Sequence, residues 1–260
     1  ILMKIKLTTL YFVILSISAC FGQNSLSFDF AEAFHNKDHY GLMGNLKMTT
    51  DSLGNHYVVC VFDGVHDVDP SANEELIEAF DQENKIFLGK YSSTGQLLWK
   101  KTTVLNVSAG ITDIHTDRNG NIYLSGFCTD SIDLGFDGSQ IIHSTGFPTQ
   151  NTKFLAKYTN NGSFIWYKAF KALSFRFNLN NDDEVIATGT YQNSIDLGLP
   201  GNSHVLNGSL YNIFLTKFSS DGDVVWAKST SYGYPTDLDV CDIGSDSNGA
   251  IYISGAFKGI

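Results

Sequence analysis

The stretch that decides the fold is "DIHTDRNGNIYLSGF" at residues 113–127, together with "NTKFLAKYTNNGSFIWYK" at residues 151–168. Imperfect copies of this pair occur before and after it in the chain. A sequence that repeats every few tens of residues predicts stacked units, because one such unit cannot bury its own apolar faces. The repeat therefore sets the expectations for the rest of the sequence.

The period of the repeat is nearly constant. Corresponding residues of successive copies are separated by 66, 63 and 66 positions, both at a turn and at a small residue further along. These residues are Asp51, Asp117, Asn180 and Asp246 at the turn, and Cys60, Gly126, Gly189 and Gly255 beyond it. Asp67, Asp133 and Asp196 form a third equivalent set, and Trp99, Trp166 and Trp226, all the tryptophans of the chain, form a fourth. We therefore expect the copies to fold alike.

Each copy is expected to form four short strands. In the clearest copy these are residues 111–116, 121–127, 153–158 and 164–170, and Asn-Gly pairs between them are typical of tight antiparallel hairpins. The second strand carries apolar side chains on both faces, so its sheet must be covered on both sides. Radial packing of sheets as blades satisfies this need, whereas the rungs of a parallel β-helix are far shorter than the repeat. The predicted fold class is all-β, a β-propeller of four-stranded antiparallel blades.

The repeat also resembles a known family. The pattern "D-x-x-G-N-x-Y-x-x-G", then "(V/I)-D-(F/L)", then "F-L-x-K-(Y/F)" and a later "W-x-K" is similar to the bacterial β-propeller repeat often described as seven-bladed. The resemblance covers residues 43–260. It implies an exported protein without catalytic residues to carry over. The third copy departs from the pattern, because "NNDDEVIATG" at 180–189 lacks the turn glycine, and the first copy has Cys60 in place of glycine.

The boundaries of the blades follow from the period. We expect full blades at 43–104, 109–170 and 172–230, and half a blade at 238–260, about 3.5 blades in all. Residues 26–34, "LSFDFAEAF", align with the fourth strand "FIWYKAF" of the clearest copy. They are predicted to be an orphan outer strand that closes a last blade missing from this sequence. On this interpretation the sequence is part of a longer protein.

Composition restricts the class of protein. The chain has 260 residues, is 43% hydrophobic, and carries 17 basic against 27 acidic side chains for a net charge of −10. No run of Lys or Arg occurs, which argues against a nucleic-acid partner, since phosphate neutralisation supplies most of that affinity. Lys4 and Lys6 precede an apolar run at 7–19 that is too short to span a bilayer. Residues 1–22 therefore look like a secretory signal, with Gln23 as the new terminus, or else a lipoprotein signal with Cys20 as the lipidated residue.

The remaining cysteines indicate neither a disulfide framework nor a zinc site. Cys60, Cys128 and Cys241 are odd in number and form no C-x-x-C pair. The main interpretation is that they are small buried thiols on strands. A bridge between Cys60 and Cys128 of neighbouring copies is the alternative.

Catalytic signatures are missing from the sequence. It contains no H-E-x-x-H, P-loop, G-x-S-x-G or dinucleotide fingerprint. Histidines recur at no common repeat position; they are His35, His39, His56, His66, His115, His143 and His204. No catalytic, cofactor-binding or metal-binding residue is therefore predicted.

One acidic loop is a weak candidate for a cation site. Residues 65–76, "VHDVDPSANEEL", are also similar to an acidic loop usual in the resembled family. The acidic side chains of this region are Asp63, Asp67, Asp69, Glu74 and Glu75. Calcium prefers such oxygen ligands, but the spacing is not that of an EF-hand. The favoured interpretation is a solvated turn in which aspartates bind local backbone amides.

Two classes of function remain. The favoured one is a non-catalytic exported scaffold at the cell surface or outside the cell, with a protein or glycan ligand, no cofactor, no nucleic acid and no transmembrane span. The alternative is a propeller hydrolase or lyase with a site in the central channel. Such a site draws residues from the first strand of several blades, and His115 and Arg176 are its obvious candidates there.

Overall fold

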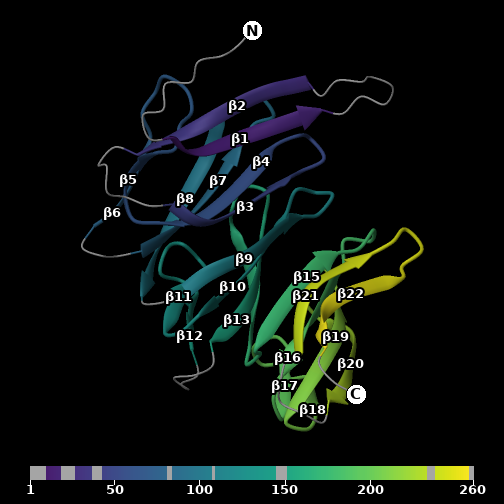
Figure 1. Cartoon of the computed structure of the whole chain (residues 1–260). Coiled ribbons are helices and arrows are strands. Elements are labelled where there is room, and N and C mark those ends of the chain that lie inside the picture. Colours follow the sequence, from purple (N-terminus) through teal and green to yellow (C-terminus); the bar gives the residue numbers. More distant parts are fainter. Residues whose placement is uncertain are drawn as a thin grey trace.

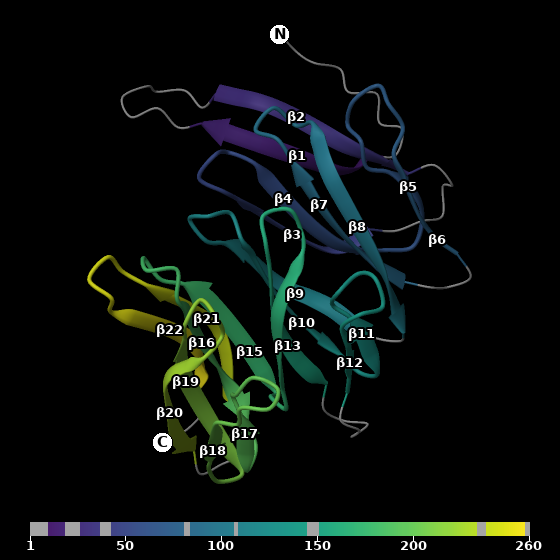
Figure 2. The same cartoon turned by 180° about the vertical axis from the view of Figure 1, so that it is seen from behind.

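The computed structural model confirms an all-β chain. It describes residues 10–18, 27–36, 43–80, 84–106, 109–144, 151–232 and 238–257, and within these ranges there is no helix. No part of that described chain could therefore cross a membrane as a helix. Figures 1 and 2 show antiparallel sheets placed one after another, from the purple N-terminal strands to the yellow C-terminal hairpin.

Three repeat units each form a four-stranded antiparallel sheet in chain order. The first is β3 (Met43–Thr50), β4 (His56–Phe62), β7 (Asn84–Tyr91) and β8 (Leu97–Asn106). The second is β9 (Ala109–Thr116), β10 (Ile122–Cys128), β13 (Thr152–Tyr158) and β14 (Phe164–Phe170). The third is β15 (Ser174–Leu179), β16 (Val185–Tyr191), β19 (Tyr211–Phe218) and β20 (Val224–Tyr232). A final hairpin, β21 (Leu238–Ser245) and β22 (Ile251–Phe257), matches the first half of a unit.

The strand registers of the units are the same. In each unit the tryptophan of the fourth strand pairs with a lysine of the third, and the residue before the tryptophan is an extra, bulged residue. The pairs are Trp99 with Lys90, Trp166 with Lys157, and Trp226 with Lys217. The propeller-like repetition predicted from the spacing is therefore confirmed in atomic detail.

The connection between the second and third strands contains a small hairpin that the sequence did not predict. These hairpins are β5 (Gly64–Asp67) with β6 (Leu76–Ala79), β11 (Ser131–Asp133) with β12 (Ile141–His143), and β17 (Ser194–Asp196) with β18 (Val205–Asn207). β11 pairs with β8 of the preceding unit, which extends that sheet to six strands. The hairpin covers the outer edge of the preceding blade, where unpaired backbone groups would invite aggregation.

The N-terminal strands follow the same pairing pattern as the repeat units. β2 (Ser27–Asn36) pairs with β5 through Asn36 and His66, as β8 pairs with β11 through Leu105 and Ile132. The segment predicted as an outer strand is thus a strand in the place of a fourth strand. Its role in closing a last blade stays a prediction.

The predicted signal segment is described only in part. Residues 1–9 and 19–26 lie outside the described residues, whereas β1 (Leu10–Ser18) pairs antiparallel with β2. Removal of the segment on export stays a prediction.

Neighbouring units are joined by equivalent hydrogen bonds. The Trp99 indole Nε1 donates to the Asn160 carbonyl over 3.3 Å, and the Trp166 Nε1 donates to the Ser220 carbonyl over 3.2 Å. Asn160 and Ser220 occupy the same place in the turn between the third and fourth strands. The tryptophan of one blade therefore holds the turn of the next.

The two cysteines on second strands are free and buried. Cys60 packs in the apolar cluster that contains Val58 and Phe87, whereas Cys128 packs in the cluster between the first two units. The alternative of a Cys60–Cys128 bridge is therefore wrong. Burial raises the pKa of the Cys60 thiol to about 12, so this thiol is inert at neutral pH.

Cys60 fits where the other copies have glycine because the first strand has a different backbone conformation opposite it. A Cβ on Gly126 would lie 2.3 Å from the Gly110 carbonyl oxygen, which leaves no room for a side chain. Both units have a register shift here, but in the first unit Asn45, the counterpart of Ile111, adopts a positive φ of 51°. Cys60 therefore has no paired residue on the first strand, whereas Gly126 pairs with Ile111.

Candidate functional site: the wall of innermost strands

The first strands of successive units lie side by side. β3 contacts β9, β9 contacts β15, and β15 contacts β21, so these four strands form a continuous wall at the inner edge of the sheets. Figures 1 and 2 show this wall running through the middle of the molecule. In a propeller this edge faces the central channel.

One position of this wall carries a charge in every copy. Lys47, Asp113, Arg176 and Asp242 are separated by 66, 63 and 66 residues, the same spacing as the turn landmarks. They are equivalent, and their charges alternate in sign from one strand to the next. The sequence reasoning named only Arg176 from this set. The spacing was the signal that could have revealed the other three.

Bulges in the inner strands precede the charged residue in three of the four copies. Thr112 is an extra residue opposite β10, Cys241 is an extra residue opposite β22, and the shift in β3 falls just before Lys47. β15 pairs with β16 without a shift. A bulge re-aims the side chain that follows it, and bulges are common beside binding sites.

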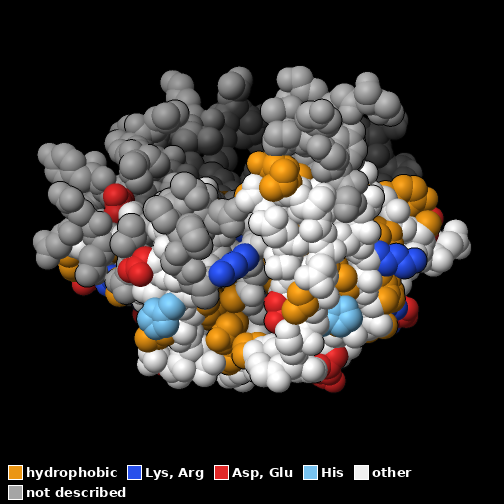
Figure 3. Space-filling model, turned by 90° about the horizontal axis from the view of Figure 1, so that it is seen from below, with side chains coloured by type: hydrophobic (Ala, Val, Ile, Leu, Met, Phe, Trp, Pro, Cys, Tyr) orange, Lys and Arg blue, Asp and Glu red, His pale blue; other side chains and the backbone are white. Residues whose placement is uncertain are grey.

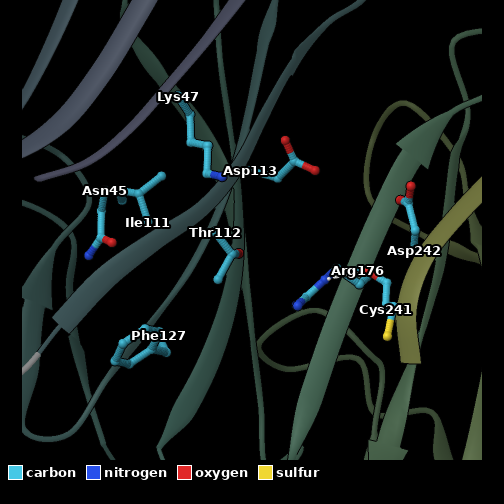
Figure 4. A pocket seen from close by; sticks show the side chains of 9 residues that line it. All are labelled: Asn45, Lys47, Ile111, Thr112, Asp113, Phe127, Arg176, Cys241 and Asp242. Carbon is cyan, nitrogen blue, oxygen red and sulfur yellow. Dashed lines mark hydrogen bonds between the residues drawn. The ribbon is translucent and has the colours of Figure 1, made fainter. Parts of the chain in front are cut away.

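The charged residues line an open cavity of about 460 Å³. Its walls come from all four inner strands, and Figure 4 shows the side chains around it. The lining residues are Asn45, Lys47, Ile111, Thr112, Asp113, Phe127, Arg176, Cys241 and Asp242.

Arg176 is held by backbone rather than by an acid. Its Nε donates to the Cys241 carbonyl over 3.0 Å, and one terminal nitrogen donates to the Phe175 carbonyl over 2.8 Å. Within the described ranges no carboxylate lies within 4.0 Å of the guanidinium. Donors of Arg176 are therefore left for a ligand, and in Figure 4 the group extends toward Thr112 and Phe127.

His115, the other predicted candidate, lies apart from Arg176. Its Nε2 is 3.2 Å from the Asp113 Oδ2, and its ring packs edge-on against Phe177 at 4.9 Å. His115 lines a separate open cavity of about 350 Å³ beside the strand turns, and Arg176 does not line it. The structure thus does not bring the two predicted residues into one pocket.

The acidic loop behaves as the favoured interpretation predicts. Asp67 Oδ1 accepts hydrogen bonds from the backbone N–H of Asp69 and of Glu75, and Asp69 Oδ1 accepts one from Ser71. In the part of the chain that the structure describes, no three His, Cys, Asp or Glu side chains are grouped to hold a metal ion. Asp133 and Asp196 make the same local bonds in the later copies.

A further groove lies at the rim between the small hairpins of the second and third units. It has a volume of about 580 Å³ and is lined on one side by β12 and on the other by residues that follow β17. Figure 3, a view from below, shows hydrophobic side chains and two histidines on this face, with Lys and Arg only at isolated points. Among the described residues of this face there is no continuous basic patch for a polyanion.

Comparison with known proteins adds no relative. No protein-family model matches the chain. No curated protein matches it either.

Proposed function

We propose that this chain is a non-catalytic scaffold that binds its ligand at the wall of innermost strands. The observation that carries the proposal is the contrast between positions that repeat and a position of the wall that does not. Trp99 and Trp166 repeat in type and in contacts, because they hold blades together. The equivalent wall residues instead change charge from copy to copy around an open cavity. Packing of the sheets does not require the charge at this position to change from copy to copy, whereas recognition of a ligand does.

We further propose that the chain belongs to the bacterial seven-bladed repeat type that its motifs resemble. The repeated four-stranded antiparallel sheets and their common register support this assignment. The remaining blades would complete the wall and enclose the cavity.

The proposal includes export to the cell surface or the surrounding medium. It rests on the basic residues and apolar run at 1–22. Mass spectrometry of the mature protein tests it and separates the two alternatives. A mature terminus at Gln23 indicates secretion, a lipid mass on Cys20 indicates membrane anchoring, and an intact leader contradicts export.

Glycan and peptide arrays test the binding function. We expect defined spots to retain the chain without any change in the mass of the spotted compound. A chain that binds no spot would contradict the proposal. The proposal would also be contradicted if the chain changed the mass of a spotted compound and the Arg176→Gln variant did not. That result would indicate an enzyme with a site in the central channel.

A further inference from the structure

A crevice between the second and third units differs from the rest of the wall in its charge. It has a volume of about 240 Å³ and adjoins the larger cavity, with which it shares Thr112, Phe127 and Arg176. Its lining includes two cations, Lys153 and Arg176, and within the described part of the chain no acidic residue lines it. The chain as a whole has 27 acidic and only 17 basic residues, so two cations side by side in one crevice run against its composition.

The second unit departs from its copies at this crevice. On facing strands, Phe127 pairs with Lys153. The equivalent pair is Val61 with Ile86 in the first unit and Thr190 with Ile213 in the third. An isoleucine therefore satisfies the sheet at this position twice, so the pairing of these two strands does not require a lysine. Its Nζ lies 5.0 Å from the centre of the Phe127 ring, within range of a cation–π contact.

The crevice also offers neutral polar groups. The hydroxyl of Thr112 lies 2.7 Å from that of Ser125, and the hydroxyl of Ser174 lies 2.8 Å from that of Thr190. Thr112 and Ser174 both line the crevice. A hydroxyl can turn to donate or accept, so each can serve a bound oxygen atom.

We propose that this crevice binds the oxyanion group, a carboxylate or a sulfate, of the ligand taken by the wall. The inference rests on the proposed binding function and names the chemistry of its ligand. Arginine, whose remaining donors form a planar fork, suits a carboxylate or sulfate, and Lys153 adds a second positive charge. A volume of about 240 Å³ has room for one anionic group and a short carrier.

Calorimetric titration of the purified chain with four small probes tests the proposal. The probes are glucuronate, glucose 6-sulfate, succinate and glucose. We expect at least one anionic probe to bind and glucose not to bind. A preference for glucuronate and succinate would identify the group as a carboxylate, and a preference for glucose 6-sulfate would identify it as a sulfate. Binding should weaken as salt is raised, since the attraction is screened.

Two variants locate the site. Lys153→Ile installs the residue of the two other copies and should keep the fold, while the affinity for the anionic probe falls about tenfold or more. Arg176→Gln should have an effect of at least that size. Arg118→Gln is the matched control, because Arg118 lies on the strand turns outside the crevice and should leave the affinity unchanged.

Three results would overturn the inference. They are equal binding of glucose, no binding of any anionic probe at tens of millimolar, and anion binding that Lys153→Ile leaves intact. If the arrays still show ligands in any of these cases, the binding function stands and only the chemistry assigned to the crevice is wrong.

Discussion

The tryptophan of the fourth strand shows how one side chain joins two blades. The Trp166 ring is 92% buried, packs edge-on to Tyr123 at 6.0 Å and donates to a carbonyl of the next unit. A Cβ on Gly222, which has a φ of 88°, would lie 3.1 Å from this ring. The glycine of the turn is therefore needed both for its left-handed backbone and for the close approach of the indole.

Replacing Trp166 by alanine should destabilise the chain strongly. We expect a loss of about 3–5 kcal/mol in the free energy of unfolding, because the substitution removes a buried aromatic side chain and leaves a cavity in its place. Urea unfolding measures this loss. Trp226→Ala is the control: Trp226 is only partly buried, and its indole donates no hydrogen bond within the described ranges. Equal losses of unfolding free energy for the two variants would contradict the role of Trp166 in holding neighbouring units together.

A side-chain exchange in the third copy explains why its unusual turn still forms. Asp117 Oδ1 accepts the backbone N–H groups of the turn in the second copy, and Asn180 Oδ1 does so in the third. Glu184 then supplies the carboxylate that Asp117 supplied, and it pairs with Lys217 at 2.7 Å. Asp183 takes the left-handed position of the missing glycine, with a φ of 60°. The sequence predicted the turn, but the exchange is visible only once the partners are in place.

Strand β14 carries a second joint between units. Lys168 is fully buried, donates to the Leu197 carbonyl of the third unit over 2.8 Å and lies 4.4 Å from the Phe218 ring centre. Burial lowers the pKa of Lys168 to about 8, while Asp223 and Asp196 act in the opposite direction. The folded chain therefore releases this proton at a lower pH than the unfolded chain does.

This pKa makes the stability of the chain depend on pH in a defined direction. Between pH 8 and 10 the unfolded state holds the Lys168 proton that the folded state has lost, so stability should rise with pH. Relative to Lys168→Met, the wild-type chain should gain about 2 kcal/mol over this range, since one pKa unit corresponds to about 1.4 kcal/mol. Urea titrations of both proteins at several pH values measure the difference. A difference that is constant or falls with pH would contradict the placement of Lys168.

The small hairpins mark the limit of prediction for the elements. Strands such as β11 and β17 have three residues each, too short for an alternating pattern to show. β11 is held by β8 of another copy, a partner that no local pattern reveals. The long strands were predictable because their turns and apolar runs lie within one copy.

For the molecule as a whole, the repeat period predicted that the units stack side by side. The search for sequence motifs did not find the cavity that the four charged wall residues line. Lys47, Asp113, Arg176 and Asp242 are not all of one residue type, so no motif of fixed letters connects them. They are linked by their spacing in the sequence and by their equal place on neighbouring inner strands. The bulges that precede three of them, and the lysine at position 153 that replaces an apolar residue, become meaningful once the sheets are side by side.

The central claim is that equivalent residues of successive copies have equivalent surroundings. Spin labels at Thr94, Asn161 and Asp221, exposed residues at the same place of three turns, test it directly. Cys20 and Cys241 are replaced by serine so that only the introduced cysteines react. Pulsed electron resonance should give narrow and coincident distance distributions for the pairs 94–161 and 161–221. Distributions that differ by more than their widths, or a broad one for either pair, would contradict the account.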